Sequence, residues 1–202
     1  ETLMDGAADD PDTAGRFLGV INSEVDRMTR LVRDLLQLSS LDNRQMRLEL
    51  KSGSIAELVR KTCEKMRMEA QSKEQTLECH IGDDIPGVKM DHDRMEQVVL
   101  NIISNAIKYT LEGGRIIVRL NSEDDRVRLS VADNGIGIPG EDLPRIFERF
   151  YRVDKARSRE MGGTGLGLSI AKEIVEVHGG EMSISSEVDR GTEVVVELPA
   201  DV

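Results

Sequence analysis

The sequence predicts an α+β fold, an α/β sandwich in which helices cover a mixed sheet of about five strands, preceded by one long coiled-coil-like helix. Helical and strand-like segments follow one another irregularly after residue 43, which favours a layer of helices on a mixed sheet. Of the 202 residues, 39% are hydrophobic, enough for one full domain with a smaller appendage. Aromatic residues make up only 2%, so we expect Leu, Ile, Val and Met to form the core.

Composition and charge exclude several classes of partner. The net charge is −11 and no basic stripe could neutralise a run of phosphates, so we expect no nucleic-acid partner. No apolar run is long enough to span a bilayer, which predicts a cytoplasmic fragment without direct membrane contact. Cys63 and Cys79 lack metal-ligand spacing and are interpreted as reduced core thiols. Because the sequence starts at Glu1 in a helical pattern, we expect it to be part of a longer chain.

A long helix is predicted from Asp10, which caps the first turn before Pro11, to about Leu41. Its apolar residues recur mostly at three- and four-residue intervals, at Phe17, Ile21, Met28, Leu31, Leu35 and Leu38. Such a stripe packs on its own domain or on a second copy of the helix, and the heptad-like spacing favours a dimer. We place a domain boundary near residue 43, which divides the chain into residues 1–43 and residues 44–202.

The second part of the chain is predicted to mix helices and strands. Its helices are expected at residues 54–71, 92–109 and 166–178, with Ser54 and Asp91 as N-caps and Gly179 as a stop. Its strands show alternating apolar residues and are expected at residues 46–50, 76–81, 88–90, 116–120, 127–131, 182–185 and 193–198. A polar, irregular stretch is expected from Pro139 to Gly163.

A polar stripe runs along the predicted helix of residues 92–109. Asn101, Asn105 and Lys108 are spaced at i, i+4 and i+7, so they lie together on the side opposite the apolar face. Amide oxygens are hard, neutral ligands that suit Mg²⁺ when it shares the phosphate oxygens of a nucleotide. Each residue alone is more typical of a solvated helix face, so the interpretation as a nucleotide site depends on the motifs that follow it.

Two glycine-rich segments follow. Asp133 ends a predicted strand, and the flexible Gly135 and Gly137 let the backbone turn closely past a flat ligand. An ionised carboxylate only accepts hydrogen bonds, which suits an exocyclic amine, although an ordinary Asp-containing turn explains this segment equally well. Gly163, Gly165 and Gly167 lead into a helix, and the N–H groups at a helix start bind phosphate.

The stretch before the second glycine segment is basic within an acidic chain. Its charged and polar residues are Arg152, Lys155, Arg157, Ser158 and Arg159. A basic loop beside a phosphate-binding turn indicates a phosphate clamp, and we assign the contact with a γ-phosphate to Arg152. The other charges of this loop are interpreted as solvated.

Four motifs in this order resemble the asparagine box, first glycine box, phenylalanine box and second glycine box of sensor histidine kinases. They are Asn101–Tyr109, Asp133–Gly137, Phe147–Phe150 and Gly163–Leu168. The resemblance covers nearly the whole chain and implies the ATP-binding fold of the Bergerat type. It also identifies residues 1–43 with part of the dimerisation and histidine-phosphotransfer hairpin. We interpret Phe147 and Phe150 as packing residues beneath the loop.

The resemblance also implies roles for single residues. Asn105 would coordinate Mg²⁺ with support from Asn101, Lys108 and Tyr109 would contact phosphate and ribose, and Asp133 would accept from the adenine amino group. The catalytic residues implied are Asn101, Asn105 and Arg152. The other binding residues implied are Gly135, Gly137, Ile138, Gly163, Thr164, Gly165, Leu166, Gly167 and Leu168.

We therefore expect the catalytic fragment of a sensor histidine kinase. It would bind Mg·ATP and pass the γ-phosphoryl group to a histidine outside this sequence, for onward transfer to an aspartate of a response regulator. The intact kinase would be a membrane-bound homodimer. His80, His92 and His178 lack the neighbouring residues of a phosphate acceptor and are interpreted as structural, with a cation at His178 favoured by the helix C-terminus.

Two alternatives come from other classes. Related ATPases of the gyrase, heat-shock chaperone and mismatch-repair types carry a glutamate base where this chain has Asn101. An amide cannot take a proton from water, which argues against efficient hydrolysis. An inactive docking module would lack nucleotide-binding residues that are present here.

Segments of the first helix, such as Asp34–Ser39, resemble a narrower group of kinases that regulates cell-wall metabolism in Gram-positive bacteria.

Overall fold

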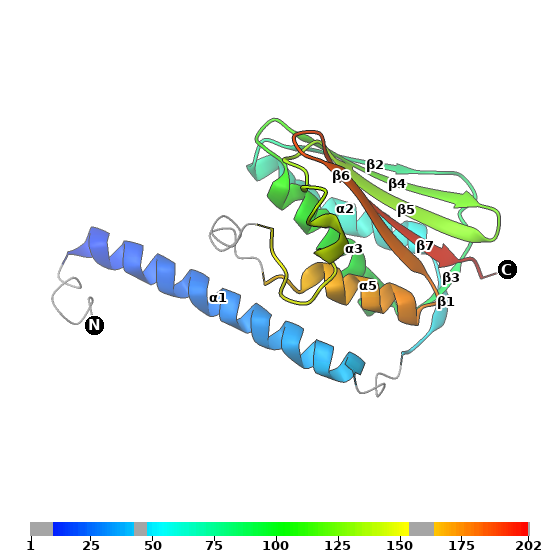
Figure 1. Cartoon of the computed structure of the whole chain (residues 1–202), viewed down its shortest axis with the longest axis horizontal. Helices are drawn as coiled ribbons and strands as arrows, with labels where there is room; N and C mark the ends of the chain where they lie inside the picture. The colour runs from blue at the N-terminus through cyan, green and yellow to red at the C-terminus, as the bar shows by residue number, and fades with distance from the viewer. Residues whose placement is uncertain (1–9, 43–47, 154–163, 202) are drawn as a thin grey trace.

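The computed structural model describes residues 10–42, 48–153 and 164–201 of the chain. A sheet forms one layer, and three helices form a second layer against one face of it (Figure 1). The long N-terminal helix runs along the outer side of this helical layer, where it contacts the last helix. The helices are α1 (Pro11–Asp42), α2 (Ile55–Ser72), α3 (His92–Tyr109) and α5 (Gly167–Val177).

The main sheet has five strands in the order β2-β4-β5-β7-β6. Its strands are β2 (Thr76–Ile81), β4 (Arg115–Glu123), β5 (Arg126–Asp133), β6 (Glu181–Glu187) and β7 (Gly191–Pro199). The pair β2 and β4 is parallel and the other pairs are antiparallel, so the sheet is mixed. The predicted fold class, a mixed sheet of about five strands covered by helices, is confirmed.

A second, two-stranded sheet joins β1 (Lys51–Gly53) to β3 (Val88–Met90). The strand predicted at residues 46–50 is wrong in position, because β1 begins at Lys51 and residues 48–50 lie in no strand. Residues 46 and 47 lie outside the described residues. Alternation of apolar side chains predicts a strand, but the strand forms only where a partner is available, and β3 offers three residues.

The hairpin of β4 and β5 is longer than predicted. The two strands pair as far as Glu123 and Arg126, so the turn consists of Asp124 and Asp125 alone. Asp124 takes a left-handed conformation, with φ of 51°, which Asp tolerates better than most residues. At this turn the pairing therefore extends three residues beyond the predicted end of β4, at residues 121–123, and one residue before the predicted start of β5, at Arg126.

The predicted helix caps are present. The side chains of Ser54 and Asp91 accept hydrogen bonds from the third residues of α2 and α3, Glu57 and Arg94, each at 3.2 Å. At the end of α5, the N–H of Gly180 donates to the carbonyl of Val175 at 3.0 Å. These contacts satisfy backbone groups that a helix leaves open at its ends.

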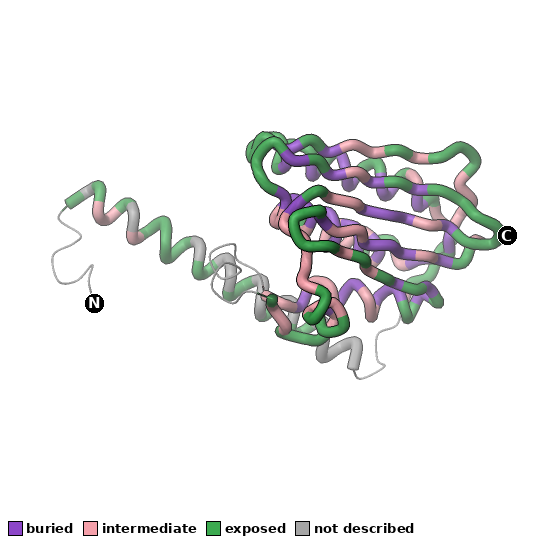
Figure 2. Tube along the Cα trace, turned by 45° about the horizontal axis from the view of Figure 1, so that its top comes forward, coloured by how far each residue is buried: buried purple, intermediate pink, exposed green. Residues whose placement is uncertain are grey.

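The core lies between the sheet and the helical layer. On α3, Met95, Val99 and Ile103 are at most 1% exposed, and on β4 Ile116 and Val118 are fully buried. Figure 2 shows the buried residues concentrated in these two facing layers. Cys63 on α2 is buried and Cys79 on β2 is half-buried, and both are free thiols, as predicted.

Helix α1 differs from the rest of the molecule in exposure, since Figure 2 colours most of its described residues as exposed. Of the predicted stripe, Ile21, Met28 and Leu35 are exposed, while the side chains of Leu31 and Leu38 lie outside the described ones. An exposed apolar stripe is consistent with the predicted dimer, which stays a prediction. Within the described residues, no helix combines the length and the hydropathy needed to cross a membrane.

Candidate nucleotide site

Helices α3 and α5 lie side by side and run in opposite directions, and the middle of α3 is tied to the start of α5. The Nδ2 of Asn101 donates a hydrogen bond to the carbonyl of Gly167 at 3.1 Å. A Cβ at Gly167 would lie 3.7 Å from the Asn101 side chain, an ordinary van der Waals contact, so this approach does not depend on glycine. The two helices that carry the asparagine and second glycine motifs are thus in direct contact.

The rest of the predicted polar stripe shares one side of α3. Asn101, Asn105, Lys108 and Tyr109 are all half-buried, between the buried apolar face and the exposed Ser104. Within this group the Nζ of Lys108 lies 5.1 Å from the centre of the Tyr109 ring. The helix therefore presents amide oxygens and a cation together at a partly sheltered surface.

The first glycine segment folds against the end of α3. The N–H of Gly135 donates to the Oδ1 of Asp133 at 2.9 Å, and the N–H of Ile136 donates to the carbonyl of Tyr109 at 3.1 Å. A Cβ on Gly135 would lie 2.3 Å from that same carbonyl oxygen, a distance that no side chain allows. Gly135 is therefore required for the loop to close onto α3.

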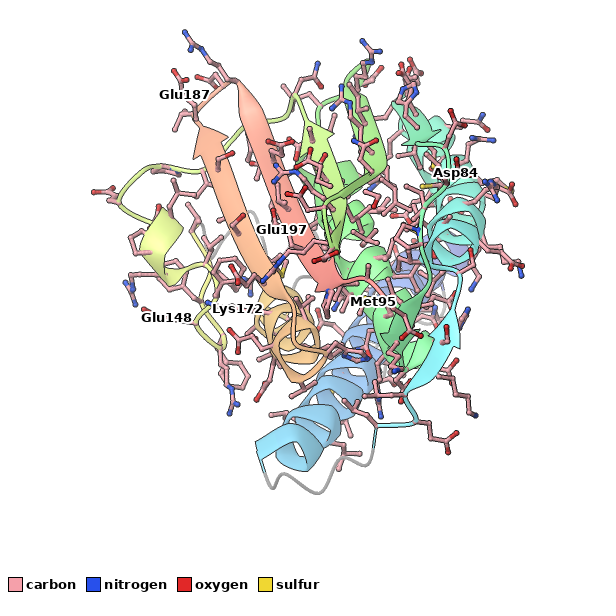
Figure 3. All side chains as sticks on the ribbon, turned by 90° about the vertical axis from the view of Figure 1, so that its right-hand side faces the viewer. Asp84, Met95, Glu148, Lys172, Glu187 and Glu197 are labelled. Atoms are coloured by element: carbon pink, nitrogen blue, oxygen red, sulfur yellow. The ribbon has the colours of Figure 1, made fainter. Side chains whose placement is uncertain are left out.

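The hairpin of β6 and β7 packs against this glycine loop and donates or accepts hydrogen bonds there. Gly137 has φ of 67°, and a Cβ there would lie 2.1 Å from the carbonyl oxygen of Glu187, which Figure 3 labels at the end of β6. The N–H of Ile138 donates to the Oγ of Ser186 at 2.8 Å, and this hydroxyl also contacts that of Thr192. Neither hydroxyl residue was predicted, because only the tertiary fold brings the hairpin to the glycine loop.

Asp133 lies at the centre of these contacts. Burial raises the pKa of its carboxyl above the ordinary value, and hydrogen bonds from the backbone of Gly135 and Thr192 partly oppose that effect. Gly191 makes the position possible, since a Cβ there would lie 1.9 Å from the carbonyl oxygen of Asp133. The Asp133 carboxylate is therefore a partly buried hydrogen-bond acceptor that water solvates incompletely.

The second glycine segment meets the phenylalanine segment. Gly165 has φ of 75°, and its carbonyl accepts a hydrogen bond from the N–H of Phe150 at 2.9 Å. The N–H of Leu166 donates to the hydroxyl of Thr164 at 3.3 Å. No described side chain caps the start of α5. The first N–H groups of this helix therefore point out of its N-terminus, toward the space in front of Gly167.

The two phenylalanines behave differently. Phe147 packs against the core beneath Lys172, whose Nζ lies 4.7 Å from the centre of its ring. The packing role predicted for Phe150 is wrong, because its side chain is 55% exposed. With φ of 64°, this residue contributes its backbone N–H to the contact with Gly165 instead. Figure 3 shows the segment around Glu148 beside β6, which is an edge strand of the sheet, and near Lys172.

Arg152 follows this contact by two residues. Its Nε and Nη2 atoms are buried, and within the described part of the chain they have no hydrogen-bond partner. A buried guanidinium without an acceptor is costly, so this geometry indicates a place for an anion. The other predicted residues of this loop, Lys155, Arg157, Ser158, Arg159 and Gly163, lie outside the described residues.

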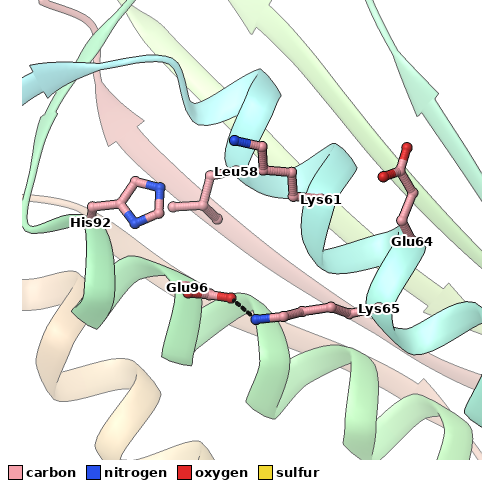
Figure 4. A pocket seen from close by; sticks show the side chains of 6 residues that line it. All are labelled: Leu58, Lys61, Glu64, Lys65, His92 and Glu96. Carbon is pink, nitrogen blue, oxygen red and sulfur yellow. Dashed lines mark hydrogen bonds and ion pairs between the residues drawn. The ribbon is translucent and has the colours of Figure 1, made fainter.

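Other features of the surface do not join this site. The hollow in Figure 4 lies between α2 and α3, is crossed by an ion pair of Lys65 with Glu96, and shares no residue with the motifs above. In the described ranges, no group of three or more His, Cys, Asp or Glu side chains is placed to hold a metal ion. The structure thus brings both glycine segments against α3, and Arg152 follows by two residues the segment that pairs with Gly165.

The chain belongs to the histidine kinase-, DNA gyrase B- and HSP90-like ATPase family, whose sequence model matches residues 90–202. It is 43% identical to the sensor histidine kinase WalK of Bacillus subtilis (strain 168) over 203 residues, 98% of this chain and 33% of that protein. A sensor protein kinase WalK of Staphylococcus aureus is 42% identical over the whole chain, which covers 49% of it. The predicted resemblance to sensor histidine kinases is confirmed, and the narrower group is that of WalK. The chain spans only a third to a half of the length of these relatives.

Solved structures agree with this assignment. Full-length ShkA in complex with AMPPNP matches with a TM-score of 0.79 and 30% identity over 92% of this chain and 38% of that chain. Histidine kinase ThkA in complex with the response regulator protein TrrA matches with a TM-score of 0.76 and 27% identity, over 95% of this chain and 52% of ThkA. Both structures share the arrangement of helices and sheet described above.

Proposed function

We propose that this chain binds Mg·ATP and transfers the γ-phosphoryl group to a histidine. The observation that carries the proposal is that the Nε and Nη2 atoms of Arg152 are buried without a hydrogen-bond partner in the described part of the chain, two residues after the contact of Phe150 with Gly165 that precedes α5. An anion at this place would receive hydrogen bonds from Arg152 and from the helix N-terminus. The AMPPNP bound by the related ShkA supports a nucleotide phosphate as that anion.

The remaining contacts follow from the same arrangement. Asp133 is the acceptor for the adenine amino group, in a pocket floor formed by Gly135, Gly137 and Ile138. Lys108 and Tyr109 at the end of α3 contact phosphate and ribose. The backbone of the second glycine segment, Gly163, Thr164, Gly165, Leu166, Gly167 and Leu168, holds the phosphates. Each residue is offered as a binding residue on its place in the fold and on the family resemblance.

Magnesium fits the donors on α3. Amide oxygens and phosphate oxygens form a hard, oxygen-only set in which Mg²⁺ keeps several waters, and Asn105 is the proposed protein ligand. The half-buried position of Asn105, one turn from Asn101, suits that role. When bound, Mg²⁺ neutralises charge on the phosphates during transfer.

Transfer to histidine is favoured over hydrolysis by the surroundings of Asn101. Its amide nitrogen is engaged with Gly167, and an amide has no basic group that could activate water. A neutral imidazole nitrogen needs no such base. The new nitrogen–phosphorus bond forms as the bond from the γ-phosphorus to the bridging oxygen breaks, and ADP leaves.

The acceptor histidine is proposed to belong to a dimerisation helix outside this sequence. His178 is buried with both ring nitrogens engaged, which removes it as a candidate. By analogy with ThkA and TrrA, the phosphohistidine then serves a response regulator. Residues 1–43 are proposed as part of the dimerising hairpin and residues 44–202 as the catalytic domain, on the cytoplasmic side of a membrane-bound kinase.

The test is transfer of label from γ-labelled Mg·ATP to a separate WalK-type hairpin that carries the acceptor histidine. Asn105→Ala should abolish transfer, whereas Ser104→Ala, at the neighbouring exposed position, should not. Acid-labile label on the hairpin supports the proposal. Release of free phosphate without labelled protein would replace the kinase by a hydrolysing ATPase, and no nucleotide binding at all would leave a docking module.

A further inference from the structure

His178 closes α5 at the end opposite the glycine segment, and its ring makes two hydrogen bonds. Its Nδ1 lies 2.7 Å from the carbonyl oxygen of Ile174, and its Nε2 lies 3.0 Å from the backbone nitrogen of Asp91. A carbonyl only accepts and an amide only donates. The ring must therefore carry its proton on Nδ1 and accept at Nε2, which makes it neutral.

This neutral ring corrects the sequence interpretation, in which a cation at His178 suited the end of the helix. A second proton on Nε2 would face the N–H of Asp91, with donor against donor. The side chain is 7% exposed, so water cannot easily replace the lost contact. The role of the ring is to join two helices rather than to complement a helix dipole.

Asp91 in turn joins three segments. Its N–H donates to His178 at the end of α5, its Oδ1 accepts from the N–H of Arg94 in the first turn of α3, and its Oδ2 accepts from the N–H of Glu49. Glu49 belongs to residues 48–50, which precede β1 and follow α1 in the chain. The N-cap of α3 is therefore also the attachment point of the segment that comes from α1.

The geometry points to His178 as a positioning residue that, through Asp91, fixes α5 against α3 and couples both helices to residues 48–50. Asn101 and Gly167 already tie the two helices near the glycine segment. Residues 91 and 101 are about 15 Å apart along a helix at 1.5 Å per residue. Core side chains already pack α5 against α3, and two hydrogen bonds at this separation further restrict the angle between the two helices.

The consequence concerns the proposed nucleotide site, and in this respect the inference rests on the proposed function. Asn101 and Asn105 are on α3 and the phosphate-binding turn leads into α5, so their spacing depends on the angle between these helices. His178 touches neither nucleotide nor acceptor in this proposal. Displacement of residues 48–50 would reach both helices through Asp91, which gives α1 a physical connection to the site.

Two substitutions separate the two hydrogen bonds. In His178→Gln the side-chain oxygen can take the place of Nε2 as acceptor for Asp91, while the donor to Ile174 is lost. In His178→Asn the amide nitrogen takes the place of Nδ1 and the acceptor for Asp91 is lost. His92→Asn, at an exposed histidine in the first turn of α3, is the matched control.

The first readout is hydrogen exchange at the backbone amides of Asp91 and Glu49 in the whole chain. We expect protection to fall about fivefold or more in His178→Asn, as the loss of one hydrogen bond predicts, and to be kept in His178→Gln and His92→Asn. Unchanged protection at Asp91 in His178→Asn would overturn the inference. So would an equal loss of protection in all three variants.

The second readout is affinity for Mg·ATP, which should weaken about fivefold in His178→Asn and stay within about twofold in His178→Gln. Unfolding curves show whether each variant is folded at the assay temperature. If the unaltered chain bound no ATP, the proposed function would fail, while the exchange of Asp91 would still decide whether His178 links the helices. Equal ATP affinity in His178→Asn and the unaltered chain, with protection lost, would overturn the positioning role.

Discussion

The side-chain nitrogen of Asn101 and the carbonyl oxygen of Gly167 lie 3.1 Å apart, and this hydrogen bond joins the helices that carry the two most distinctive motifs of the chain. The residue at the place of a general base in related hydrolases is thus used to hold α3 against α5. An acidic side chain there could not donate to the carbonyl.

Replacement of Asn101 tests this contact. Asn101→Ala should lower the free energy of unfolding by about 1 kcal/mol, since one hydrogen bond is lost. Asn101→Asp should cost more, because a carboxylate would face the Gly167 carbonyl oxygen. Denaturant unfolding measures both changes. Ser104→Ala, at an exposed position on the same helix, should stay within about 0.5 kcal/mol. A stable Asn101→Asp would contradict the assignment of the contact.

Gly137 of the first glycine segment and Gly140, which follows that segment, provide a matched pair. Gly137→Ala should unfold the loop or abolish nucleotide binding, because its Cβ would lie 2.1 Å from the carbonyl oxygen of Glu187 at φ of 67°. Gly140→Ala should bind nucleotide normally, since nothing lies within 4 Å of its Cβ. Thermal unfolding and ATP titration of both variants distinguish them. Equal behaviour of the two would show that the hairpin does not support the loop as described.

Asp133 is expected to lower the stability of the folded chain at neutral pH while it contributes to ATP binding. Burial raises the pKa of its carboxyl, so the folded chain holds this proton more tightly than the unfolded chain does. Stability from this group is full below the unfolded value, near 3.8, and is lost as pH rises through the folded-state pKa. Asp133→Asn does not ionise, so at pH 7 it should be at least as stable as the natural chain, with an advantage that shrinks in acid.

If Asp133 accepts from the adenine amino group as proposed, the same substitution should weaken ATP binding by about tenfold or more, because a hydrogen bond to a charged acceptor is lost. Unfolding curves at several pH values and nucleotide titration at pH 7 supply the two measurements. A variant that is less stable at pH 7 and more stable in acid would reverse the sign and refute the burial argument.

The two cysteines report on the contact between α2 and β2. A hydrogen bond from the Cys63 thiol is the main effect that lowers the pKa of Cys79; nearby Arg60, His80 and Arg67 add to this effect, and burial opposes it. The pKa of Cys63 is raised. We expect the Cys79 thiol of the folded chain to react with iodoacetamide with a half-maximal rate below pH 9.0, the ordinary pKa of a cysteine.

Cys63→Ala removes the donor, so the midpoint for Cys79 should move up toward its ordinary value of 9.0. Mass spectrometry of the alkylated chain identifies the modified residue and gives the rate at each pH. Reaction first at Cys63, or a midpoint that the substitution leaves in place, would show that the two thiols do not meet as described.

The sequence predicted the parts of the fold that depend on local chemistry. Ser54 and Asp91 cap their helices because a side-chain acceptor beside an open N–H group is a local requirement. The strand at residues 46–50 was misplaced, because pairing with β3 selects Lys51–Gly53 and pairing is not visible in one segment. Predictions of strands therefore carry the larger error in this chain.

The residues of the candidate site also divide into those that the sequence could predict and those that only the fold brings together. The motif residues Asn101, Asp133 and Gly165 could be recognised because their spacing along the chain is characteristic. Ser186 and Thr192 could not be recognised, because a serine and a threonine on a hairpin have no characteristic spacing. Only the fold brings the Ser186 hydroxyl to the N–H of Ile138 and the Thr192 hydroxyl to that of Ser186. His178 was identified as structural, but its charge state depended on Asp91, 87 positions away.

The most direct test of the nucleotide site is the affinity of the Arg152→Gln variant for Mg·ATP and for Mg·ADP, measured by calorimetry. Arg149→Gln is the matched control, because that arginine is paired with Glu173 at 3.4 Å. If Arg152 binds the γ-phosphate, its substitution should weaken ATP about tenfold or more and leave ADP within about twofold. Equal effects on both nucleotides, or no effect on either, would contradict the assignment of the buried guanidinium to the γ-phosphate.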